Sequence, residues 1–68
     1  MTYRQAKQLL SPGDTVYIPA NGRIVRAIVQ SIRPDMLVTN LDNLFYDEVP
    51  GIWYLTRNGA VMALKGGK

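Results

Sequence analysis

Residues 15–32 hold two hydrophobic runs separated by a pair of turn residues, and this pattern predicts a β-hairpin. The runs meet at Asn21-Gly22, a dipeptide that suits a type I′ turn because both central residues of that turn need a positive φ. A two-residue loop sets the register, with Ala20 opposite Arg23. Apolar side chains of one parity then share a face, which we expect to point into the core. The inward residues are Val16, Ile18, Val25, Ala27 and Val29.

The second strand is predicted over residues 23–33, and its parity breaks once, at Ile32. A β-bulge near Gln30-Ser31 would return Ile32 to the core and bend the strand, as long strands do where a small barrel turns a corner. Without a bulge, Ile24, Ile28 and Ile32 would form an apolar stripe on the outer face. Such a stripe is typical of a contact surface.

Two short helices are predicted near the ends of the chain. The first opens at Thr2-Tyr3-Arg4-Gln5, which fits a capping box, and ends at a Pro12-Gly13-Asp14 turn. Residues 57–65 fit either a last strand or a helix capped by Thr56. The helix is favoured because alanine, methionine and leucine are good helix formers, and Gly66-Gly67 would stop it.

Three further short strands are predicted, over residues 36–39, 44–46 and 52–55. Turn-forming residues separate them, and the last of these breaks is Val49-Pro50-Gly51. The order of helix, five strands and helix predicts a mainly β fold. We expect one domain over residues 1–68, a small SH3-like five-stranded antiparallel β-barrel with short N- and C-terminal helices.

Several stretches resemble a group of small uncharacterised SH3-like β-barrel proteins of phages, prophages and mobile elements of Firmicutes. The matching stretches are Pro12-Gly13-Asp14, Asn21-Gly22, residues 24–32 and residues 53–64. The chain departs from the group at Asn58-Gly59, where the group carries acidic residues. The resemblance implies an SH3-like barrel and an origin in a mobile element, and it implies no catalytic residue.

The composition argues against an enzyme and against a metal or cofactor. The 68 residues include no cysteine and no histidine, so disulfides and thiolate metal sites are excluded. Ser11 and Ser31 have no histidine to activate them, and no glycine-rich phosphate loop follows a strand. Asp47-Glu48 is the only adjacent acidic pair, and a solvated loop explains it better than an ion site. We expect a non-enzymatic protein without a cofactor.

The remaining features of the composition concern location and charge. No stretch is apolar enough for a signal peptide or a membrane span, so we expect a cytoplasmic protein without membrane contact. The formal net charge is +3, from eight Lys and Arg against five Asp and Glu. This is a mild excess, whereas nucleic-acid binding usually needs a concentrated basic patch.

The outer side of the hairpin is the best candidate for contact with a partner. The register puts Tyr17 outside, opposite Arg26, where the pair could bind a partner or merely stabilise the hairpin by a few tenths of a kcal/mol. Adjacent Trp53 and Tyr54 have opposite parity, so only one of them can enter the core. The candidate binding residues are Tyr17, Arg23, Arg26, Arg33, Trp53 and Tyr54.

Two functions fit these candidates. The first is a protein-interaction module, acting by strand addition or through an aromatic groove and able to inhibit or modulate its partner. Self-association is a variant of it, because an open sheet edge invites pairing. The alternative is nucleic-acid binding by the hairpin arginines and Tyr17.

Overall fold

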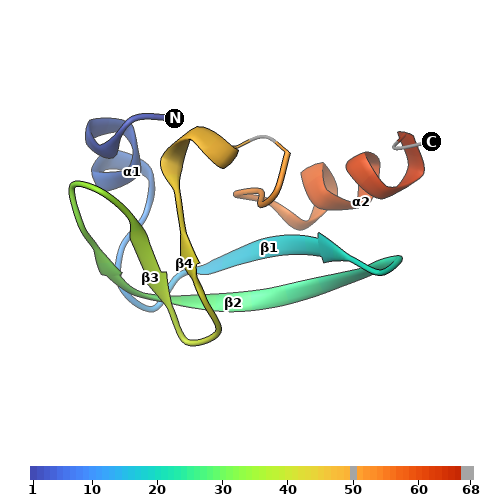
Figure 1. Ribbon diagram of the computed structural model, residues 1–68, viewed down its shortest axis with the longest axis horizontal. Coiled ribbons are helices and arrows are strands. Elements are labelled where there is room, and N and C mark those ends of the chain that lie inside the picture. Colours follow the sequence, from blue (N-terminus) through green and yellow to red (C-terminus); the bar gives the residue numbers. More distant parts are fainter. Residues whose placement is uncertain (50, 67–68) are drawn as a thin grey trace.

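The computed structural model, which describes residues 1–49 and 51–66, shows a curled antiparallel sheet with a helix at each end (Figure 1). In chain order the elements are α1 (Tyr3–Leu9), β1 (Thr15–Ala20), β2 (Arg23–Ile32), β3 (Leu37–Thr39), β4 (Asn43–Leu44), a 3-10 turn η1 (Tyr46–Glu48) and α2 (Arg57–Gly66). The strand order is β1-β2-β3-β4. Of the predicted helix stop at Gly66-Gly67, Gly66 is the last helical residue of α2, and Gly67 lies outside the described part of the chain, as does Pro50 in the predicted break.

The β1–β2 hairpin has the predicted register. Ala20 lies opposite Arg23, and the pairing continues to Thr15 opposite Ile28. Asn21 has a φ of 53° and Gly22 a φ of 76°, as a type I′ turn requires. The predicted register is confirmed. The turn conformation depends only on the turn residues, and a two-residue turn allows only one register for the two strands.

The β-bulge is confirmed as well. Pairing between β2 and β3 shifts between Val29 and Ser31, after which Ile32 lies opposite Leu37. Ile32 consequently packs against the core, so the outer apolar stripe is shortened. On the outer face Ile24 is half-buried and Ile28 is 39% exposed.

The predicted five-stranded barrel is wrong, since the described residues form four strands and the sheet stays open. Residues 52–55 touch β1 through a single bridge, in which Tyr17 and Tyr54 exchange two backbone hydrogen bonds of 2.9 and 2.7 Å. The next such pair toward the hairpin turn would join Pro19 to Ile52, and proline has no N–H to donate. In the other direction the pair would need Thr56, which already caps α2. Both ends of the ladder are thereby blocked.

The predicted strand over residues 44–46 is shorter than expected. The chain leaves the sheet after Leu44 and forms η1, where the Phe45 N–H donates to the Glu48 carboxylate at 2.9 Å. The Tyr46 hydroxyl lies within hydrogen-bond distance of the carbonyl oxygens of Arg33 and Met36. Tyr46 therefore turns inward to hold the β2–β3 loop, which a continued strand would not allow.

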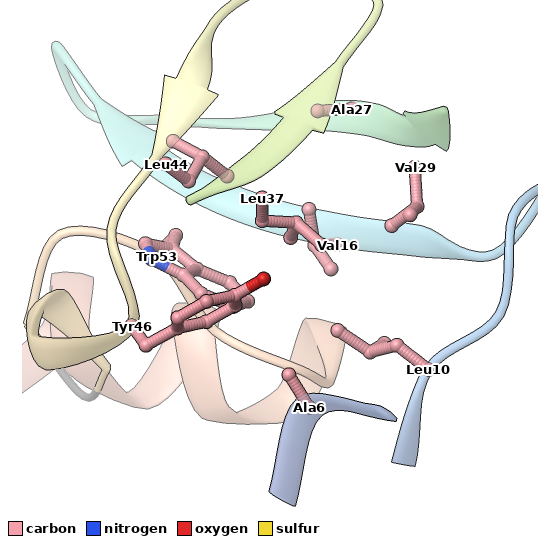
Figure 2. Close-up of a cluster of buried hydrophobic side chains, with 9 residues drawn as sticks. All are labelled: Ala6, Leu10, Val16, Ala27, Val29, Leu37, Leu44, Tyr46 and Trp53. Carbon is pink, nitrogen blue, oxygen red and sulfur yellow. The ribbon is translucent and has the colours of Figure 1, made fainter. Parts of the chain in front are cut away.

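The core lies between the inner face of the sheet, α1 and the segment that carries Trp53 (Figure 2). Trp53, Leu37, Val16 and Val29 are its largest fully buried side chains. The indole Nε1 of Trp53 donates to the Phe45 carbonyl at 2.9 Å, so burial leaves its polar group satisfied. The core is thus centred on a residue from outside the four strands.

Both helices begin as predicted. Thr2 and Gln5 form the capping box of α1, and residues 57–66 are helical, not a strand. The Gly59 N–H donates to the Thr56 hydroxyl at 3.0 Å, which caps α2. A Cβ on Gly59 would lie 3.1 Å from the Thr56 hydroxyl oxygen and 3.4 Å from the Tyr54 ring. Glycine at this position thus leaves room for the hydroxyl that caps the helix.

Candidate functional site

The hairpin arginines meet α2 at a surface hollow between β2 and the helix, which we call the arginine hollow. Its lining residues are Gly22, Arg23, Ile24, Arg26, Arg57, Val61 and Leu64. Figure 1 shows α2 lying alongside the half of the hairpin that ends in the turn. The hollow therefore joins two segments that are more than thirty positions apart in the chain.

Regular backbone periodicity places five of the lining residues, and Arg23 joins them from beside the hairpin turn. Ile24 and Arg26 are two positions apart on β2, so they share its outer face. Arg57, Val61 and Leu64 follow the i, i+4, i+7 spacing of one helical face. The two faces meet because the capped start of α2 is attached to the edge of β1 by the bridge at Tyr54.

The arginine hollow combines a charged rim with an apolar floor. Arg23, Arg26 and Arg57 are all exposed, whereas the aliphatic residues between them are half-buried. Among the described residues, none that lines the hollow carries a carboxylate. The first turn of α2 also contains no acidic residue, so the positive end of the helix dipole is not neutralised there. The surface is thus suited to an anionic ligand that also has an apolar part.

Tyr17 faces a second hollow, which we call the leucine hollow. Its lining residues are Leu9, Leu10, Asp14, Thr15, Tyr17, Leu55, Thr56 and Arg57. Arg57 lines both hollows, so they are neighbours on the surface. The expected pairing of Tyr17 with Arg26 holds in the register, but the two side chains line different hollows.

The other candidates from the sequence are not brought together with the hairpin arginines. Arg33 follows Arg23 by ten positions, which is about 30 Å along an extended strand. Trp53 is fully buried and can offer no surface to a partner. Tyr54 is half-buried, and its backbone forms the bridge to β1. Arg23 and Arg26 are the predicted residues that do share one site.

Arg57 is the residue that sequence analysis missed. It precedes Val61 and Leu64 at helical spacing, so a helix beginning at Thr56 already implied that all three share a face. No local pattern indicated that this face would meet β2, because the contact depends on how the last third of the chain returns to the edge of β1.

Two acidic side chains accept hydrogen bonds from backbone N–H groups. Asp14 accepts the Ser11 N–H at 2.8 Å within the Pro12-Gly13-Asp14 turn, and Glu48 accepts the Phe45 N–H. Within residues 1–49 and 51–66, no three acidic residues gather into a set that could hold a metal ion.

Desolvation raises the pKa of the Tyr46 hydroxyl above its ordinary value of 10.0, so this hydroxyl stays protonated and hydrogen-bonded to a higher pH than a free phenol. This hydroxyl and the two carboxylates are structural.

The chain matches no protein-family model, no curated protein and no solved structure. None of the helices in the described part of the chain is long and apolar enough to cross a membrane. Function must therefore be inferred from the surface of this chain, and the arginine hollow is the part of it with the most distinctive chemistry.

Proposed function

We propose that this chain is a small non-enzymatic binding module that contacts a protein partner through the arginine hollow and the adjoining outer face of the hairpin. We further propose that it is a cytoplasmic accessory protein of a phage or mobile element, which inhibits or modulates that partner. The observation that carries the proposal is the convergence of Arg23, Arg26 and Arg57 around an apolar floor. Arginine is one of the residue types enriched in the hot spots of protein interfaces.

Nucleic-acid binding by the same arginines is the second candidate, because three guanidinium groups can contact successive phosphates. Two features favour protein over nucleic acid. The floor of the arginine hollow is aliphatic, whereas single-stranded bases stack on aromatic rings. The outward aromatic residue of the hairpin, Tyr17, lines the leucine hollow instead, and Arg33 lies beyond the far end of β2.

The test is affinity capture by the immobilised full chain from a Firmicutes lysate, with and without nuclease, followed by mass spectrometry. A protein captured in both conditions is purified, and its affinity is measured by calorimetry. We expect Arg26→Gln to weaken binding, because it removes a charged hydrogen-bond donor from the hollow.

Arg33→Gln is the matched control, since it makes the same charge change at an exposed arginine just beyond the end of β2. Equal weakening by the two variants would contradict the arginine hollow as the contact surface. Loss of every captured protein after nuclease, with salt-sensitive binding of single-stranded DNA or RNA, would support the second candidate.

A further inference from the structure

The chemistry of the arginine hollow also defines the class of its ligand. We infer that it binds a short acidic segment of a partner protein, which places carboxylates against the three arginines and one large apolar side chain on the floor. This inference rests on the proposed function, and it adds the ligand's chemistry and the role of Arg57.

The charge of the site is local. In the part of the chain that the structure describes, three guanidinium groups and no carboxylate line the arginine hollow. Their summed charge equals the net charge of +3 of the whole chain. Elsewhere the positive and negative residues balance. An arginine fork binds a carboxylate through two parallel hydrogen bonds, so acidic side chains are the matched partners for this rim.

The floor of the hollow requires an apolar group as well. Ile24, Val61 and Leu64 are each half-buried, and they lie between the charged rim residues on facing surfaces of β2 and α2. A ligand that offered only phosphates would leave these apolar side chains exposed to water. A leucine, isoleucine or phenylalanine side chain flanked by acids would cover it, and apolar burial contributes in proportion to the area covered.

Arg57 lies at a position where its charge is unfavourable for the helix. A cation in the first turn of a helix opposes the dipole, whereas an acid there is stabilising. The first turn of α2 nevertheless has Arg57 and no acid. A residue that costs stability while completing a charged rim fits a role in binding, because binding sites commonly trade stability for function.

The experiment selects short peptides from a random display library on the immobilised full chain. We expect the enriched peptides to carry aspartate or glutamate on both sides of a large apolar residue. The best peptide is synthesised, together with a copy in which asparagine and glutamine replace its acids. Binding of each is measured by fluorescence anisotropy, and amide shifts in NMR spectra locate the bound peptide.

The combined variant Arg26→Gln with Arg57→Gln should lose at least about tenfold in affinity for the acidic peptide, because each arginine provides a charged hydrogen-bond pair. Arg33→Gln should bind as tightly as the natural chain. Circular dichroism shows whether each variant is folded, and exposed arginines seldom matter for folding.

Three results would overturn the inference: selected peptides without acids, equal binding of the amide copy, or an unchanged affinity in the combined variant. A captured partner whose binding is weakened by Arg26→Gln, but whose contact region carries no acidic segment, would leave the proposed function standing and reject this ligand class. A captured partner that binds the combined variant normally would refute both. If neither the library nor the lysate yields a protein ligand, both are refuted.

Discussion

Replacement of Trp53 by phenylalanine tests the proposed core most directly. The Trp53 side chain is fully buried, and its Nε1 donates to the Phe45 carbonyl at 2.9 Å. Trp53→Phe keeps an aromatic ring but leaves this carbonyl without its partner, which costs about 1–3 kcal/mol. The smaller ring leaves a void that adds about 1 kcal/mol. The expected loss is about 2–4 kcal/mol, against a total of roughly 3–10 kcal/mol for a domain of this size.

The free energy of unfolding is measured by urea titration followed by far-ultraviolet circular dichroism, because the variant removes the only tryptophan of the chain. Phe45→Leu is the control. It keeps the backbone carbonyl and changes a side chain that is 45% exposed, so its effect should stay within about 0.5 kcal/mol. A loss of less than about 0.5 kcal/mol for Trp53→Phe would refute the assignment of Trp53 as the centre of the core.

Four further substitutions test separate parts of the structure. Tyr46→Phe should cost about 0.5–1.5 kcal/mol near neutral pH. Because the folded pKa of Tyr46 is raised, the natural chain should lose stability as pH rises above 10.0, and denaturant titrations should show a shallower decline in the variant. Gly22→Ala puts a Cβ on a residue with φ 76°, so thermal unfolding should reveal a loss of about 1–2 kcal/mol, and an unchanged Tm would contradict the type I′ turn. Thr39→Val removes the hydroxyl that accepts the Asp42 N–H at 3.0 Å, which should lower the free energy of unfolding by about 1–3 kcal/mol. An unchanged free energy of unfolding in a urea titration would contradict this expectation. Arg57→Glu should stabilise the chain by about 0.3–1 kcal/mol while abolishing binding of the acidic peptide, and a fall in Tm would show that Arg57 supports the fold.

The candidate site was predicted in part. Arg26 was identified from the hairpin register, because it lies opposite the outward Tyr17 and residues of one parity on a strand share a face. Arg23 has the opposite parity and was named because it lies near Tyr17 on the hairpin. Arg57 was missed since nothing local indicates that α2 returns to β2. Trp53 was a candidate only because parity cannot say which of two adjacent aromatic residues is buried. That choice is made by the Phe45 carbonyl, which accepts the indole N–H.

The fifth strand shows the same limit for the fold. Both residues that block it, Pro19 and Thr56, are visible in the sequence. Their effect appears only once Tyr17 is paired with Tyr54, because that pair decides which positions would come next in the ladder. Without that register, neither residue rules out a closed barrel.

By itself the sequence determined the features that depend on neighbouring residues: the Asn21-Gly22 turn, the hairpin register and the capping box of the first helix. It offered the bulge before Ile32 and the helix after Thr56 each as one of two alternatives. Each of these follows from the conformational preference or parity of residues a few positions apart. The tertiary structure alone decided that the sheet stays open, that Trp53 fills the core and that Arg57 joins the hairpin arginines. These outcomes depend on contacts between segments distant in the chain, where many pairings satisfy the same local preferences and only packing of the whole domain selects one.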